Sequence, residues 1–252
     1  MITHFIFLSS SYHLGTRIAL DYIVTDSRVQ EKIKQHLDKI TKECGKDVSI
    51  STHMIQTDNT TWESVCIADH FFKDVKVIES VDKFIRLIKK DRKLEGIDVA
   101  KYILSKVKCT QLKLQKLVYF CFADYLCDTG KELFTDKIFA FKYGPVVESV
   151  YKKYKEYGYK PIEEETVNID SIHISEMPAK SRILFAEDGT EKMISIDKTL
   201  KKYGDLSASE LVDLTHRENA PWAQSSKNIS KLKSYSLMKL DTIRDCHKFE
   251  EI

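Results

Sequence analysis

The sequence predicts an α+β protein with a small N-terminal α/β unit and a mostly helical second domain that contains a short β element. Three observations lead to this prediction. Alternating apolar and polar residues, which are typical of half-buried strands, are concentrated before residue 80. The charged run 89–93 then leads to Gly96, which interrupts the pattern, and from there the apolar residues recur mainly with helical spacing. We therefore expect one domain over residues 1–94 and a second over residues 96–252.

The N-terminal unit is predicted to combine five strands with two helices. Strands are expected over residues 2–9, 17–24, 48–54, 61–68 and 75–78. The first helix is expected to begin at a capping box formed by Ser27 and Gln30 and to end at Gly45. Its inward face should carry Val29, Ile33, Leu37, Ile40 and Cys44. The second helix should begin after Ser80. Its inward face should carry Val81, Phe84, Ile85 and Ile88.

Helices dominate the second domain. They are expected at about residues 97–107, 111–128, 146–157, 197–203, 208–217 and 236–249. Ser207 and Glu210 form a capping box for the fifth of these helices. A short hairpin is expected to pair residues 183–185 with residues 193–196.

The bulk composition is that of an ordinary globular protein. Of the 252 residues, 42% are hydrophobic and 31% are charged, and the net charge is +2. No run of about 18 apolar residues is present, so we expect no membrane-spanning helix. The apolar run at residues 5–8 is too short for a signal peptide and has no basic residues before it. We expect a cytoplasmic protein without a membrane partner.

The cysteines and the absence of nucleotide motifs argue against a metal or a cofactor. No two of the six cysteines form a CxxC pair, so we expect free thiols in a reducing compartment and no metal site. The sequence has no GxGxxG, GxxxxGK[ST] or HExxH motif. The cysteines are Cys44, Cys66, Cys109, Cys121, Cys127 and Cys246.

The helix over residues 111–128 is apolar on two faces, which predicts that it is buried between layers. Lys116 lies on one of these apolar stripes, four residues after Leu112 and four before Phe120. A lysine in this place has three alternatives. It can extend its amine to water, pair with an internal carboxylate, or point into a groove that receives a partner. The sequence alone leaves these three alternatives open.

Two further segments combine aromatic and polar residues. Residues 139–143 alternate as a strand, and Gly144-Pro145 is expected to lead into the next helix, with Pro145 in its first turn. This joint is either a structural corner or a helix start that offers N–H groups to an anionic group of a partner. His216 and Trp222 lie at the exit of a later helix. Trp222 is expected to fill the core and to donate its indole N–H to a carbonyl.

Charge is unevenly distributed along the chain. Ten basic and only three acidic residues lie between positions 84 and 116, a net charge of +7. A solvated junction between helices explains this pattern, and a basic patch for nucleic acid or for an acidic protein is the alternative.

Residues 96–222 resemble the Panacea domain, the SocA-like antitoxin family that also occurs in phage-associated GepA-type proteins. The resemblance is carried by the KLQKLVYF block at 113–120 and the FAFKYGPVV block at 139–147. The other matching positions are Leu133, Phe134, Val150, Tyr151, Tyr154, Lys155, Leu211, His216, Ala220, Pro221 and Trp222. The resemblance implies a mostly helical domain that binds and blocks a toxin encoded beside it, without catalysis of its own. It does not extend to residues 1–95.

We therefore expect the antitoxin of a toxin–antitoxin system, which neutralises its cognate protein toxin by direct contact and is not an enzyme. No catalytic residue, metal ligand or cofactor is expected. A DNA-binding regulator that uses the basic stretch 84–116 is one alternative, and an N-terminal nuclease or nucleotide-modifying effector fused to its antidote is another. A homo-oligomer is also left open. The expected partner-binding residues are Lys116, Tyr119, Tyr143, Gly144, Pro145, His216 and Trp222.

Overall fold

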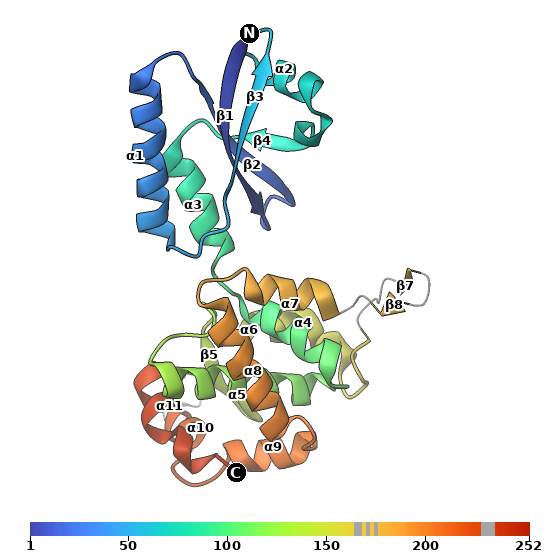
Figure 1. Cartoon of the computed structure of the whole chain (residues 1–252). Helices are drawn as coiled ribbons and strands as arrows, with labels where there is room; N and C mark the ends of the chain where they lie inside the picture. The colour runs from blue at the N-terminus through green and yellow to red at the C-terminus, as the bar shows by residue number, and fades with distance from the viewer. Residues whose placement is uncertain (164–167, 170–171, 174–175, 228–234) are drawn as a thin grey trace. The chain divides into compact units, whose positions relative to one another are not determined.

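The structure is a computed structural model that describes residues 1–163, 168–169, 172–173, 176–227 and 235–252 (Figure 1). The α+β fold class predicted from the sequence is confirmed. The chain divides into two compact units, Met1–Arg92 and Lys93–Ile252, and each is described by itself. No helix in the described ranges is long and apolar enough to cross a membrane.

The N-terminal unit is built on a four-stranded sheet in the order β3-β1-β2-β4. Strand β1 is antiparallel to both of its neighbours, and β4 is parallel to β2. Because successive side chains of β1 point to opposite faces, Phe7 packs on one face while Ile6 and Leu8 pack on the other. The strands are β1 (Ile2–Ser11), β2 (Thr16–Ile23), β3 (Ser51–Thr57) and β4 (Val75–Val77).

Helices cover both faces of this sheet (Figure 1). Helices α1 (Ser27–Cys44) and α3 (Val81–Asp91) pack against the face that carries Phe7, while α2 (Trp62–Ala68) and the turn η1 (His70–Phe72) pack against the other. The inward face of α3 is as predicted, and Ser80 caps this helix through the backbone N–H of Lys83.

Three predictions for this unit are wrong. Residues 61–68 form helix α2 instead of a strand, because Thr61 caps a helix start and the apolar residues meet the core with helical spacing. The cap of α1 is Asp26, whose carboxylate accepts hydrogen bonds from the backbone N–H groups of Arg28 and Val29, and not Ser27. Leu37 is exposed instead of facing inward.

The second unit is organised around helix α5 (Gln111–Thr129), which is buried along most of its length. Packed against it are α4 (Gly96–Lys106), α6 (Glu148–Tyr154), α8 (Gly189–Tyr203), α9 (Ala208–Thr215) and α11 (Leu240–Cys246). A small antiparallel sheet of β5 (Ile138–Phe141), β6 (Gly144–Val147) and β9 (Ser236–Leu237), ordered β6-β5-β9, also contacts α5 through β6. The remaining elements are η2 (Lys155–Tyr157), β7 (Asn168–Ile169), β8 (Ile172–His173), α7 (Glu176–Leu184), α10 (Pro221–Ser226) and η3 (His247–Phe249).

The structure corrects several predictions in this unit. The hairpin expected from residues 183–185 and 193–196 is absent, because residues 183–184 end α7, residues 185–188 form the turn that follows, and residues 193–196 lie within α8. The joint at Gly144-Pro145 is a hairpin, in which β5 (Ile138–Phe141) pairs with β6 (Gly144–Val147) and helix α6 begins only after β6. Pro145 is tolerated in a strand because β6 lies at the edge of its sheet. Strand β9 (Ser236–Leu237) begins where a helix was expected.

Candidate functional site

Two consecutive side chains of α5 hold the β5–β6 hairpin in place. The side-chain oxygen of Gln115 accepts a hydrogen bond of 2.9 Å from the backbone N–H of Val147. The amine of Lys116 donates one of 3.1 Å to the carbonyl oxygen of Pro145. Gln115 and Lys116 are both buried, so these bonds form in a low-dielectric interior where their loss is costly. The KLQKLVYF block at 113–120 and the FAFKYGPVV block at 139–147 therefore contact each other in the fold.

Lys116 does not extend to water, because its side chain has no exposed surface. Its amine lies over Gly144, which has a φ of +104° and no side chain. Burial lowers the pKa of Lys116 to about 7, although the charge of Glu250 acts in the opposite direction. The first of the three sequence alternatives for this lysine is therefore wrong. The amine donates to a backbone carbonyl, and the Glu250 carboxylate acts on it through charge.

Tyr119 lies one turn further along α5 and belongs to a buried polar cluster. Its hydroxyl donates a hydrogen bond of 2.5 Å to Glu250 Oε1. The same oxygen lies 2.8 Å from His247 Nδ1. Glu250 is fully buried, and burial raises its pKa although His247 and Tyr119 oppose this change. Burial of the phenol, reinforced by the neighbouring Glu250, holds the pKa of Tyr119 well above its usual value.

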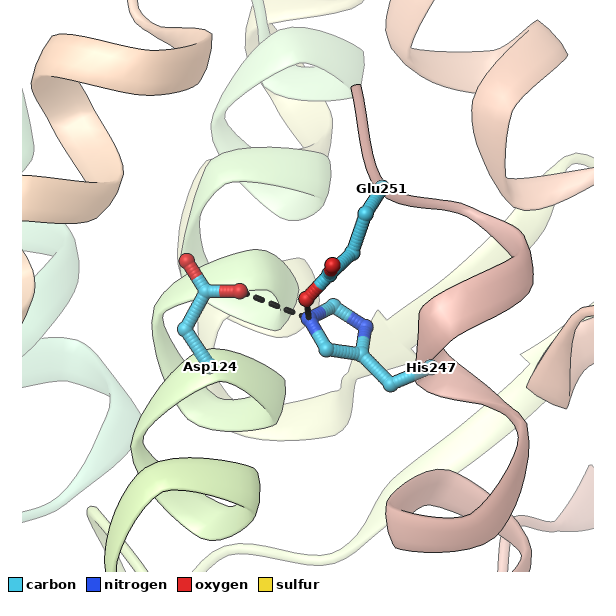
Figure 2. A group of neighbouring side chains, drawn as sticks. All are labelled: Asp124, His247 and Glu251. Atoms are coloured by element: carbon cyan, nitrogen blue, oxygen red, sulfur yellow. Dashed lines mark hydrogen bonds and ion pairs between the residues drawn. The ribbon is translucent and has the colours of Figure 1, made fainter.

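The cluster continues through the other nitrogen of His247 (Figure 2). Nε2 lies 2.6 Å from Asp124 Oδ1 and 3.8 Å from Glu251 Oε1. Burial lowers the pKa of His247, but the hydrogen bonds and charges of Asp124 and Glu250 outweigh it and raise the pKa to about 9. The second oxygen of Asp124 accepts a hydrogen bond of 2.6 Å from Thr199 Oγ1.

Of this cluster, sequence reasoning identified only Tyr119 and missed the other members. Its members come from α5, α8 and the segment around η3, and His247 lies 123 positions after Asp124. The only local signal is the spacing of His247, Glu250 and Glu251, which places three polar side chains within one helical turn.

His216 and Trp222 contact each other beside the hairpin. Their ring centroids are 3.7 Å apart, and His216 Nδ1 lies 2.7 Å from the carbonyl oxygen of Val212. The indole N–H of Trp222 donates a hydrogen bond of 2.7 Å to the carbonyl oxygen of Phe141, which confirms the predicted indole contact. Trp222 is half-buried and packs against the core from its edge.

Tyr143 lies in the two-residue turn of the hairpin and is 63% exposed. The amine of Lys142 lies 5.2 Å from the centre of its ring. Of the predicted partner-binding residues, only Tyr143 is exposed, whereas His216 and Trp222 are half-buried. The four other members are buried. Lys116 supports the hairpin from beneath, Tyr119 joins the polar cluster, and Gly144 and Pro145 are part of strand β6 of the hairpin itself.

The basic stretch 84–116 is divided between the two units. Several of its charges are already used within the protein. Lys89 pairs with Glu43, and Arg92 pairs with Asp47 while being itself buried. Lys116 is buried as well, so Arg92 and Lys116 add nothing to an exposed basic surface, and the charge of the exposed Lys89 is offset by Glu43.

Comparison with known proteins places an antitoxin-type domain over this hairpin. The family model "Antitoxin SocA-like, Panacea domain" matches residues 114–223, a range that contains every predicted partner-binding residue. The chain is also similar to Antitoxin SocA of Caulobacter vibrioides (strain NA1000 / CB15N). The two are 30% identical over 132 residues, which is 49% of this chain and 66%, just under two thirds, of the relative. No solved structure matches the chain. The resemblance inferred from the sequence blocks is thus confirmed for residues 114–223.

Proposed function

We propose that this protein, in which residues 114–223 are a SocA-like Panacea antitoxin domain, is the antitoxin of a toxin–antitoxin pair and neutralises its toxin by direct protein–protein contact. The observation that carries the proposal is the match of this domain family to the residues that build the β5–β6 hairpin and its support. In this proposal the protein acts by binding and contributes no catalytic step.

We place the toxin contact on the hairpin surface, which we define as Tyr143, His216 and Trp222. Tyrosine and tryptophan are enriched among the residues that dominate binding energy at interfaces, because they bury large areas at low entropic cost. The contact of Trp222 with His216 and its bond to Phe141 fix both aromatic rings before a partner arrives. A surface held in its bound shape loses less entropy on association.

Phe141, at the end of strand β5, extends the aromatic surface beyond the hairpin. Its ring stacks on that of Tyr235 with centroids 5.1 Å apart, and it lies 6.0 Å from that of Tyr151. Tyr235 and Tyr151 are 49% and 37% exposed. This neighbourhood supports a contact area larger than the three residues of the hairpin surface.

The buried residues have a different role in this proposal. Lys116 and Gln115 do not reach the surface, so they act on the partner only by holding the hairpin in position. The N-terminal unit lies outside the matched domain, and we propose that it adds partner specificity or contacts between copies.

The proposal is tested with the protein encoded beside this chain in its genome. That protein is expressed in a host cell with and without this chain, and the two are then co-purified. We expect growth to stop when the neighbouring protein is expressed alone and to resume when this chain is expressed with it. We also expect the two proteins to elute as one complex. Inhibition that this chain does not relieve, or relief without a complex, would contradict direct neutralisation.

A further inference from the structure

A histidine and two carboxylates converge at one end of the buried polar cluster (Figure 2). One ligand atom from each of Asp124, His247 and Glu251 lies within 4.8 Å of the other two. We propose that these three residues bind a divalent transition-metal ion such as Zn²⁺. The inference does not depend on the proposed antitoxin function.

Two of the three ligands, His247 and Asp124, are oriented by a neighbour, as in established metal sites. The Nδ1 of His247 is held 2.8 Å from the buried carboxylate of Glu250, which directs Nε2 toward Asp124 and Glu251. Thr199 donates to Oδ2 of Asp124 and leaves Oδ1 directed at the histidine. A carboxylate that accepts from the second nitrogen of a ligating histidine fixes its tautomer and makes it a better ligand.

The same region contains polar atoms that the described residues do not satisfy. The hydroxyl of Tyr203 and the Oε2 atom of Glu250 are buried and have no hydrogen-bond partner there. Tyr203 itself has no exposed surface, and the charges of Asp124, Glu251 and Glu250 act on its hydroxyl. Buried polar atoms are almost always paired, so the unpaired hydroxyl of Tyr203, on which the charges of the ligands Asp124 and Glu251 act, is an independent sign that an ion with its water belongs here.

The chemistry of the donors selects the class of ion. One imidazole with two carboxylates suits Zn²⁺ or a similar first-row divalent metal, and Glu251 is 45% exposed, which leaves a position for water. In the ion-free protein a proton lies between His247 Nε2 and Asp124. When the metal binds, it takes the place of this proton, which is released to solvent. The nitrogen and oxygen must then separate from 2.6 Å to about 3.3 Å, a small side-chain movement.

The expectation of no metal was based on the cysteine spacing and on the absence of an HExxH motif. Neither criterion detects a histidine and carboxylates that are distant in sequence and come together only in the fold. An ion at this place would join the segment 247–251 to α5.

The test uses the untagged full chain, stripped with a chelator and titrated with Zn²⁺ by calorimetry, together with melting curves. We expect one ion per chain and a higher melting temperature with the ion. Glu251→Gln should weaken the affinity by about tenfold or more and should melt like the unsubstituted protein in chelator, because Glu251 is partly exposed. The matched control is Asp128→Asn, one turn along α5, where the carboxylate is 50% exposed and pairs with Lys198. It should bind zinc like the unsubstituted protein.

Because the chain has six cysteines, Co²⁺ is used as a second probe. We expect a cobalt spectrum without a thiolate charge-transfer band. The proposal is overturned if the unsubstituted protein binds no zinc, if Glu251→Gln and Asp128→Asn bind it equally well, or if the cobalt spectrum shows thiolate ligation.

Discussion

The amine of Lys116 occupies the space that a side chain at Gly144 would need. A Cβ atom at Gly144 would lie 2.4 Å from Nζ of Lys116 and 3.1 Å from Oγ1 of Thr215. The glycine is therefore required by its φ of +104° and by its neighbours, and the buried lysine can reach the carbonyl of Pro145 only because the glycine has no side chain.

Gly144→Ala should destabilise the second unit by more than about 1–3 kcal/mol, the range typical of an unfavourable backbone conformation. The extra loss comes from the contacts with Lys116 and Thr215. Gly130→Ala is the matched control, because Gly130 has a φ of +72° but no atom within 4 Å of the place where a Cβ would lie. Chemical denaturation measures both. Equal losses would show that Lys116 gives way without cost.

Lys116 should make stability depend on pH in a defined direction. Its pKa is about 7 in the folded protein and about 10.4 in an unfolded chain. Between these values the unfolded chain binds the additional proton, so stability should rise with pH over this window and change little below it on account of this group. The charge of Glu250 opposes the lowering of this pKa. The contribution of Lys116 is therefore measured as the difference in pH dependence between the unsubstituted protein and a variant without the lysine.

Denaturation at pH 7 and pH 9, in the presence of chelator, is compared between the unsubstituted protein and Lys116→Met. Between pH 7 and pH 9 the free energy of unfolding should rise less for Lys116→Met than for the unsubstituted protein, because the variant lacks the contribution of the lysine. Parallel pH profiles for the two proteins would mean that Lys116 stays protonated in the folded state.

Leu117→Ala should cost about 2–5 kcal/mol, because Leu117 has no exposed surface and lies in the main core of the second unit. Leu184→Ala is the control, since Leu184 is 44% exposed at the end of α7 and its loss should be below about 1 kcal/mol. Unfolding can be followed by Trp222 fluorescence in a Trp62→Phe background, because the chain has only two tryptophans. A small loss at Leu117 would show that α5 is not the centre of the core.

Trp222→Phe should remove the hydrogen bond to Phe141 while keeping an aromatic ring against His216. We expect a loss of about 1–3 kcal/mol, because the carbonyl of Phe141 loses its donor in a partly buried place. The melting temperature measures this loss. An unchanged value would indicate that water replaces the indole.

Local patterns predicted those parts of the fold that depend on neighbours in sequence. The capping box of Ser207 and Glu210, the end of α1 at Gly45 and the buried helix α5 are all present. The errors arose where one pattern suits two structures. Gly144-Pro145 fits both a helix start and an edge strand, and only the pairing of β6 with β5 decides between them.

The candidate site was predictable only in part for the same reason. The two sequence blocks identified Lys116 and Tyr143, but exposure depends on tertiary packing, which buries Lys116 and leaves Tyr143 accessible. The contacts of Asp124 with His247 join residues that are distant in sequence and carry no motif, so no local pattern could reveal them.

The most direct test of the proposed binding mode is the dissociation constant of the complex with the cognate toxin for two tyrosine variants. Tyr143→Ala removes the exposed ring of the hairpin surface, and Tyr159→Ala removes a tyrosine that is 95% exposed elsewhere in the same unit. Both variants should keep the melting temperature of the unsubstituted protein. We predict that Tyr143→Ala weakens the complex by about tenfold or more and that Tyr159→Ala leaves it unchanged. Equal affinities for the two variants would contradict a toxin contact at the hairpin surface.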